Sequence, residues 1–371
     1  MGVNRLSRYV RNCLHDLKPY IPGKPIEEVK RELGLESVIK LASNENPLGA
    51  SASAKDAVRQ LLDQSHIYPD GSCYELKQAL ATHLQVAPEE LIVGNGSDEI
   101  IKMLAETFLN QGDEVIAPVP SFSEYWFAAT VMNANVVGVQ LGSDFSYDVQ
   151  AIIDAVTPKT KMLFLCSPNN PTGTYLCKAD LEKILAEIPD DIIVVIDEAY
   201  AEFVTADDFP SGIDYIHQHR VIVLRTFSKI YGLAAYRIGY GVADAEMIHY
   251  INRVREPFNV NSFAQTAAIA ALADEEHKQE SRQLVADGKE YLYREFADLG
   301  LKYVDSEANF VFVDTGVDGK QVFHKLLVRG VIVRTGDIFG YPTYIRVTFG
   351  TSEENKRFIS ALREVLAELR N

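Results

Sequence analysis

Residues 221–242 read VIVLRTFSKIYGLAAYRIGYGV. The run Val221–Leu224 is continuously apolar, which is typical of a strand buried on both faces, and a second strand-like run follows at Ile238–Val242. Between them, Thr226-Phe227-Ser228-Lys229 places a lysine directly after the end of a strand. We therefore expect polar chemistry at the carboxyl end of a buried sheet.

The same pattern of short apolar runs extends through the middle of the chain, and amphipathic stretches separate the runs. One amphipathic stretch begins near Ser97 and repeats apolar residues at Ile101 and Leu104; another covers 178–188. This alternation predicts an α/β fold with a mostly parallel central sheet and helices on both faces. The other expected strands are 91–93, 114–117, 135–139, 161–166 and 192–196.

The two ends of the chain differ from the middle. Residues 1–40 are polar and rich in proline, and they predict an arm with a short helix. An Ala-rich helix at Phe263–Ala273 and a long charged helix ending near Leu299 begin the last part. We expect a large domain over 41–260 and a small α+β domain over 261–371. The strands expected there are 309–313, 331–334 and 344–348, followed by a final helix from Glu353.

Charge and composition exclude several classes of partner. The chain has 371 residues, of which 47% are apolar and 24% charged, and its net charge is −16. An acidic protein repels nucleic acid and anionic membranes, so we expect neither as a partner. No apolar run approaches the ~20 residues that a membrane helix needs. The N-terminus also lacks the apolar core of a secretion signal.

The cysteines and histidines give no sign of a metal or a disulfide framework. The four cysteines lack CxxC spacing, which indicates reduced thiols in a cytoplasmic protein. A metal hydrolase would have to use His217 and His219, but no third ligand lies nearby in the sequence. We therefore expect no metal.

The residues around Lys229 indicate that it belongs to a ligand-binding site. A lone lysine after a strand is most often solvated, but in a site partly closed to water its ammonium form is disfavoured and the neutral amine is a nucleophile. Arg237 follows it by eight residues, and a guanidinium can clamp a phosphate with two parallel hydrogen bonds. Upstream, Asp197 ends the apolar run 194–196, at the sheet edge where open α/β folds bind ligands.

A glycine-containing loop precedes the amphipathic stretch at Ser97. Gly94-Asn95-Gly96-Ser97 follows a strand, so its backbone N–H groups and the helix dipole suit an anion. A nucleotide-binding site is the alternative, because Gly94-x-Gly96 begins a dinucleotide fingerprint. Glu99 occupies the place of the third glycine, and the Lys-Ser/Thr pair of a P-loop is absent, so we favour a smaller anion.

Taken together, these segments resemble the fold-type I aminotransferases, which depend on pyridoxal phosphate. The resemblance lies in the turn Asn170–Gly173, the strand end Asp197–Tyr200, the pair Ser228-Lys229 and Arg237, all in the family order. It covers nearly the whole chain. The implied fold is the α/β architecture described above, with 41–260 as the cofactor-binding domain and the 1–40 arm contributing to the small domain and to a homodimer.

The resemblance implies a role for each of these residues. Lys229 would hold pyridoxal phosphate as a Schiff base, Asp197 would pair with the pyridine nitrogen, and Tyr200 and Asn170 would bind the ring oxygen. Lys229, Asp197 and Tyr200 are thus the expected catalytic residues. The other expected cofactor contacts are Gly96, Ser97, Asp98, Thr226, Ser228 and Arg237 at the phosphate, Phe122 stacked on the ring, and Tyr68 reaching the phosphate of the partner subunit.

Three further segments resemble the histidinol-phosphate aminotransferases: 17–23, 41–49 and 344–355. That family converts histidinol phosphate and 2-oxoglutarate into imidazole-acetol phosphate and glutamate, in L-histidine biosynthesis. The implied substrate contacts are Tyr20, Asn46, Arg334 and Arg346.

Several alternatives remain open at this point. An aromatic amino acid aminotransferase shares much of the narrower resemblance, and a phospho-amino-acid decarboxylase has a similar fold. A regulator built on this fold would need an added basic DNA-binding domain, for which the 1–40 arm is too short. Arg346, on an alternating strand, could also be a solvated residue of an edge strand.

Overall fold

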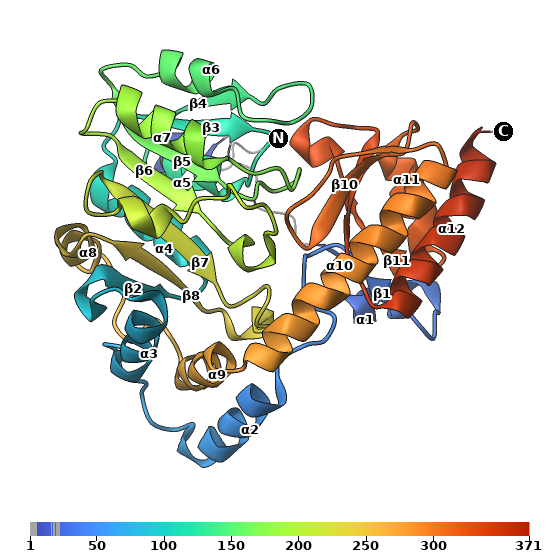
Figure 1. The fold of residues 1–371 in the computed structure, drawn as a ribbon, viewed down its shortest axis with the longest axis horizontal. Helices are drawn as coiled ribbons and strands as arrows, with labels where there is room; N and C mark the ends of the chain where they lie inside the picture. The colour runs from blue at the N-terminus through green and yellow to red at the C-terminus, as the bar shows by residue number, and fades with distance from the viewer. Residues whose placement is uncertain (1–5, 16, 18, 20–22, 371) are drawn as a thin grey trace.

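The computed structural model describes residues 6–15, 17, 19 and 23–370, and their strands form three sheets (Figure 1). The largest sheet has seven strands in the order β2-β8-β7-β6-β5-β3-β4. Its strands are β2 (Leu91–Gly94), β3 (Glu114–Val119), β4 (Asn135–Gln140), β5 (Thr160–Cys166), β6 (Ile193–Asp197), β7 (Val221–Thr226) and β8 (Gly239–Ala243).

The seven-stranded sheet is parallel except at β8, which runs antiparallel to both of its neighbours, β2 and β7. Every residue of β6 is buried. Along this strand, Val194 packs into one hydrophobic core and Val195 into a second core on the opposite face. The continuous apolar runs therefore have the expected cause, and the predicted α/β fold with a mostly parallel sheet is confirmed.

Helices cover the faces of this sheet and continue into the C-terminal part, with polar side chains capping several of their first turns. The Asn261 side chain accepts from the Ala264 N–H (2.8 Å) before α9, and Asp274 accepts from the His277 N–H (3.1 Å) before α10. The α-helices are α1 (Ile26–Leu33), α2 (Ala52–Leu61), α3 (Tyr74–Leu84), α4 (Ser97–Phe108), α5 (Glu124–Val131), α6 (Val149–Asp154), α7 (Lys178–Glu187), α8 (Ala245–Ile251), α9 (Ser262–Leu272), α10 (Glu275–Asp298), α11 (Gly319–Leu327) and α12 (Ser352–Arg370).

A second sheet of four strands, ordered β12-β13-β10-β9, lies beside α10, α11 and α12 (Figure 1). Its strands are β9 (Lys302–Tyr303), β10 (Phe310–Asp314), β12 (Arg334–Thr335) and β13 (Tyr344–Thr348). The single strand expected at 331–334 was wrong. Residues Val331–Ile332 form β11, which pairs with another partner, and Val333 separates it from β12.

The partner of β11 is β1 (Ile39–Lys40), in a parallel two-stranded sheet. Arg357 of α12 secures the same junction, because its guanidinium donates to the hydroxyl and carbonyl oxygens of Ser37, each at 2.8 Å. Residues 37–40 are thus held against the C-terminal part of the fold. The domain boundaries at residues 40 and 260 stay predictions.

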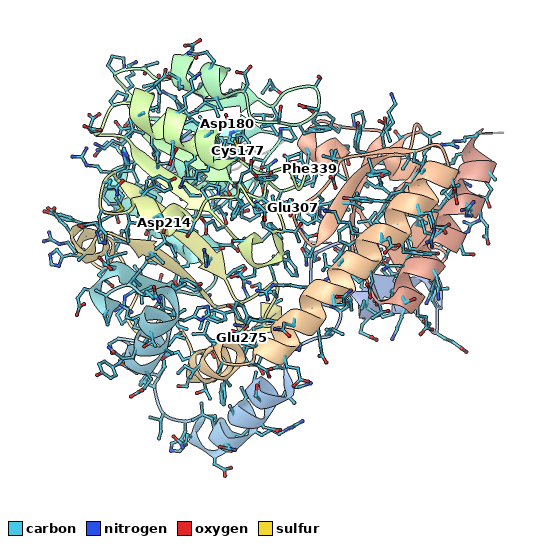
Figure 2. All side chains as sticks on the ribbon, viewed as in Figure 1. Cys177, Asp180, Asp214, Glu275, Glu307 and Phe339 are labelled. Atoms are coloured by element: carbon cyan, nitrogen blue, oxygen red, sulfur yellow. The ribbon has the colours of Figure 1, made fainter. Side chains whose placement is uncertain are left out.

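Helix α10 connects the two regions of the fold, running from α9 to the four-stranded sheet (Figure 1). Glu307 lies between these regions in Figure 2. Its carboxylate accepts from the backbone N–H of Thr205 (2.6 Å) and lies 3.4 Å from the Lys289 amine of α10. The small sheet is therefore anchored to the large one beside the strand ends that carry the site.

One glycine in the loop after β7 should be intolerant of any side chain. Gly232 has φ +67°, and a Cβ there would lie 2.1 Å from the Gly49 carbonyl oxygen. Gly300 has nearly the same φ, +66°, with open space around it. Gly300→Ala should cost about 1 kcal/mol of unfolding free energy, from left-handed strain alone. Gly232→Ala should lower the free energy of unfolding, measured by denaturant titration, by at least ~2 kcal/mol more than Gly300→Ala. The reason is that the backbone facing Gly232 would have to move to admit the new side chain. Equal losses would contradict this close approach.

Candidate functional site

A cavity of about 420 Å³ opens at the carboxyl ends of β5, β6 and β7, where the open sheet was expected to bind a ligand. Arg346 of the small sheet also lines it. The residues that line it are Ser43, Asn44, Glu45, Ser97, Asp98, Phe122, Glu124, Cys166, Asn170, Asp197, Ala199, Tyr200, Thr226, Ser228, Lys229, Ala234, Arg237 and Arg346.

Lys229 extends into this cavity from the loop after β7. Its amine donates to the Ser43 carbonyl oxygen (3.3 Å) and lies 5.6 Å from the centre of the Tyr200 ring. Burial, reinforced by the positive charge of Arg346, lowers the pKa of Lys229 to about 8. A substantial fraction of this amine is therefore neutral near physiological pH, which is the form that acts as a nucleophile or accepts a proton.

Asp197 ends β6 directly beside Cys166, its register partner on β5. The side chain is buried, and its carboxylate accepts from the Tyr125 hydroxyl (2.8 Å) and the Ala199 N–H (3.2 Å). Burial raises the pKa of Asp197 to about 6, although the Tyr125 hydrogen bond opposes the shift. Above that pH, the cavity contains a buried carboxylate that can accept a hydrogen bond from a ligand N–H.

The start of α4 forms an anion cradle together with Arg237. The first N–H groups of a helix have no partner within the helix. Gly96 enters the helix with φ +83°, and a Cβ there would lie only 2.5 Å from an Arg237 nitrogen. Arg237 is held in place by Asp98, at 3.0 Å. Lack of a side chain at Gly96 is therefore what allows the guanidinium to approach the helix start.

The hydroxyl groups of the β7 loop complete this cradle. Thr226 Oγ1 accepts from the Ser228 N–H (3.0 Å). The Ser228 hydroxyl is buried and has no hydrogen-bond partner among the described residues. A buried hydroxyl without a partner is costly unless a ligand satisfies it. Helix N-terminus, guanidinium and hydroxyl together fit the phosphate of the expected pyridoxal phosphate.

The remaining predicted cofactor residues form the walls of the cavity. Phe122 and Asn170 face it from the loops after β3 and β5. The Asn170 side-chain oxygen accepts from the Arg346 guanidinium, and Arg346 also donates to the Ala42 carbonyl oxygen (2.7 Å). The structure thus gathers Asn170, which was expected at the cofactor, with an arginine that was expected at the substrate.

Arg346 does not lie on a solvated edge strand. Its strand, β13, is flanked by β12 and β10, and Arg346 is only 6% exposed. Arg334 of β12 is its register partner. Both arginines line a second cavity of about 570 Å³ beside the first. The apolar and aromatic side chains of that cavity belong to Pro19, Val119, Pro120, Phe122, Trp126, Ile338 and Phe339.

Two predicted residues, Asn46 and Tyr68, line neither cavity, and a third lies outside the described residues. The Asn46 amide donates to the Ile230 carbonyl oxygen and the Ser281 hydroxyl, both at 2.8 Å, so its contacts in the structure fix the loop. Tyr68 is 79% exposed and stacks on Phe258, with ring centres 4.9 Å apart. Tyr20 lies outside the described residues. Their predicted roles stay predictions.

Two residues of the site were missed by sequence reasoning. Asn44 lines the cavity with φ +56° and donates to the Tyr200 hydroxyl (2.9 Å). Asparagine tolerates this left-handed backbone better than most residues, which was an available signal in the segment 41–49. Tyr125 binds Asp197 from α5, and no sequence pattern indicated that contact because it joins residues far apart in the chain.

Neither a metal site nor a membrane-spanning helix is present among the described residues. His217 lies 3.3 Å from the Glu90 carboxylate, and no group of three His, Cys, Asp or Glu side chains in the described residues is placed to hold a metal ion. No helix in the described part of the chain combines the length and apolar character that crossing a membrane requires.

Comparison with known proteins gives a consistent match. The family model described as "Aminotransferase class I and II" matches residues 36–362. The histidinol-phosphate aminotransferase of Moorella thermoacetica is 56% identical over 96% of this chain and 93% of its own length, and that of Caldicellulosiruptor saccharolyticus is 48% identical over 96% and 99%. The crystal structure of the Sinorhizobium meliloti enzyme in complex with pyridoxal-5'-phosphate is 27% identical, with a TM-score of 0.90 over 99% of both chains.

The lowered pKa of Lys229 can be measured directly. In cofactor-free protein, acylation of Lys229 by a small reagent, followed by peptide mass spectrometry, should rise with pH to a midpoint near 8. Arg346→Gln should move this midpoint upward, because it removes a positive charge that disfavours the ammonium form. The matched control Arg334→Gln should leave it in place. A wild-type midpoint near the ordinary value of 10.5 would refute the assigned environment.

Proposed function

Because this chain belongs to the class I and II aminotransferases, and among them to the histidinol-phosphate aminotransferases, we propose that it transfers an amino group between histidinol phosphate and 2-oxoglutarate with pyridoxal phosphate. The products are imidazole-acetol phosphate and glutamate, and the reaction belongs to L-histidine biosynthesis. The observation that carries this proposal is the juxtaposition of Lys229, of lowered pKa, with Asp197 and an anion cradle in one cavity.

Asp197 and Lys229 have different roles in the proposed reaction. Pyridoxal phosphate supplies an electron sink when bound, and a protonated ring nitrogen makes that sink more effective. The Asp197 carboxylate, ionised above about pH 6, stabilises the proton on that nitrogen. The Lys229 amine would hold the cofactor covalently, and the free amine can accept and return a proton at its Nζ atom.

Asn44 and Tyr200 also line the cavity, and the hydrogen bond between them orients the Tyr200 hydroxyl. Since the Tyr200 hydroxyl accepts from the Asn44 amide at 2.9 Å, its own proton is available for an oxygen in the cavity. Burial raises the pKa of Tyr200, so this proton is retained at working pH. Tyr200 would therefore donate a hydrogen bond to the ring oxygen of the cofactor.

Arg346 is the proposed anchor for the substrate anion. It is buried and cationic, and a guanidinium binds a carboxylate or a phosphate with two parallel hydrogen bonds. Arg346 would bind the glutamate carboxylate in one half-reaction and the phosphate ester of histidinol phosphate in the other. Arg334 stands at the same cavity, where Trp126 and Phe339 offer an apolar surface to a planar ring.

The same apolar surface favours the second candidate function, an aromatic amino acid aminotransferase. A phenylalanine or tyrosine ring would meet Trp126 and Phe339 as well as an imidazole ring does, with its carboxylate on Arg346. In this proposal the two activities differ in the anion that Arg346 would accept, a phosphate or a carboxylate.

A homodimer with shared active sites is part of the proposal. Tyr68, Ile67 and Leu62 expose between 56% and 79% of their surface, and Phe258, which stacks on Tyr68, is 48% exposed. Apolar residues exposed together mark association surfaces. Tyr68 would then reach the phosphate in the cavity of the partner subunit.

The proposal also includes a cytoplasmic location and the division into the arm 1–40, the cofactor-binding domain 41–260 and the small domain 261–371. All four cysteines are free thiols, as expected in a reducing compartment.

The substrate is tested by single half-reactions of the purified enzyme loaded with pyridoxal phosphate. Histidinol phosphate should discharge the visible absorbance of the bound cofactor rapidly, and phenylalanine or tyrosine much more slowly. Arg346→Gln should slow the histidinol phosphate reaction roughly 10- to 100-fold, because one charge-assisted anion contact is lost. Equal rates with the aromatic amino acids would favour the second candidate, and release of carbon dioxide would indicate a decarboxylase.

The dimer is tested by sedimentation equilibrium together with cofactor titration. We expect a dimer in which Tyr68→Phe preserves association but weakens cofactor binding several-fold, since only the hydroxyl contact to phosphate is lost. Tyr74→Phe, which changes another exposed tyrosine, serves as the control and should leave binding unchanged. A monomer with full activity would contradict the shared site.

A further inference from the structure

Tyr125 lies in the first turn of α5, directly behind the cavity, and is completely buried. Its hydroxyl donates to Oδ2 of Asp197 at 2.8 Å. The ring stacks on Phe164, with centres 4.4 Å apart and planes inclined by 12°, and it meets Phe122 edge-on at 5.7 Å. The hydroxyl therefore has one fixed position, set by packing on two sides.

We propose that Tyr125 is a positioning residue for the reaction, which fixes the Asp197 carboxylate and keeps it ionised for the ring nitrogen of the cofactor that the cavity would hold. The inference rests on the proposed function, because it concerns the group that would hold the ring proton. It adds Tyr125 to the residues on which the proposed reaction depends, although the Tyr125 side chain does not line the cavity.

The orientation of the carboxylate follows from two anchors. Oδ2 accepts from Tyr125 and Oδ1 accepts from the Ala199 N–H at 3.2 Å, so each oxygen has a fixed donor. A carboxylate with one anchor can rotate about its Cβ–Cγ bond, whereas two anchors fix its plane. The ring nitrogen of a bound cofactor would then meet an acceptor that is already oriented.

The charge of Asp197 has few other stabilising contacts. Burial raises its pKa, while the Tyr125 hydroxyl and the Ala199 N–H lower it, and the nearby carboxylates raise it further. Removing the hydroxyl should therefore make Asp197 easier to protonate. The titratable groups that face Asp197 are Asp98 on α4, Tyr125 on α5, Tyr147 before α6, Cys166 on β5, and Glu198 and Tyr200 after β6.

Tyr125→Phe tests the proposal, because it removes one oxygen atom and keeps the packed ring. The enzyme loaded with pyridoxal phosphate should retain its cofactor, and its kcat with glutamate should fall about 10-fold while KM changes less than about 3-fold. The acid limb of the kcat profile should move upward by roughly one pH unit, since a donor to the carboxylate is lost. An acid limb at the wild-type position would overturn the proposal.

Tyr147→Phe is the matched control. Tyr147 is also buried nearby, but its hydroxyl donates to the backbone carbonyl of Cys166 rather than to Asp197. Loss of this hydroxyl should lower stability without moving the acid limb. The same upward movement in both variants would mean that any buried hydroxyl of this region has the effect, and would also overturn the proposal.

A readout without the cofactor makes the test independent of turnover. In cofactor-free protein, the infrared band of a protonated carboxyl that Asp197→Asn abolishes should titrate with a midpoint near pH 6. The midpoint should be higher in Tyr125→Phe and unchanged in Tyr147→Phe. Equal midpoints in the wild type and Tyr125→Phe would count against the assigned role.

Incorporation of 3-fluorotyrosine at position 125 covers the case in which Tyr125→Phe does not fold. A fluorinated phenol is a stronger donor, so both the acid limb and the infrared midpoint should move to lower pH; an unchanged position would overturn the proposal. Failure of the proposed function is distinguishable, since the wild-type enzyme itself would then not react with glutamate.

Discussion

Burial of an amine and a carboxyl group in one cavity is the constraint on which the rest of this structure depends. In water, the pKa values of these groups would be 10.5 and 3.8, whereas burial moves Lys229 to about 8 and Asp197 to about 6. Burial of such groups is costly, and only a rigid scaffold can sustain it. Here the scaffold is the parallel arrangement of β5, β6 and β7, which brings three strand ends to one edge of a sheet enclosed by two hydrophobic cores.

The four-stranded sheet contributes a buried guanidinium, that of Arg346, to the cavity. Arg346 reaches the cavity from β13 and contacts Asn170, which follows β5. Asn44 joins the same two regions, because its backbone N–H donates to Thr348 of β13 (3.0 Å) and its side chain donates to Tyr200 (2.9 Å). The groups that the two sheets contribute to the cavity are therefore coupled through a few buried polar contacts, which we expect to make the site sensitive to changes at these residues.

The sequence predicted the sheet and most of the cavity because both depend on local patterns. Apolar runs revealed the strands, and the polar residues that follow them, such as Asp197 and Lys229, had to meet at one edge. Contacts between distant segments left no local pattern, so the Tyr125 hydrogen bond to Asp197 was not foreseen. Asn46 was preferred to Asn44 within one loop, although only the backbone conformation decides which of the two faces the cavity. Pairing likewise decided that 331–334 divides into two strands.

The most direct test of the central claim is to identify the lysine that holds the cofactor. Borohydride reduction of the enzyme loaded with pyridoxal phosphate, followed by proteolysis and mass spectrometry, should place the added mass on the peptide that contains Lys229, at about one equivalent per chain. Lys278 is the informative comparison, because it is also buried but donates to the Leu272 carbonyl oxygen outside the cavity. Added mass on Lys278 or on any other lysine, with Lys229 unmodified, would contradict the account.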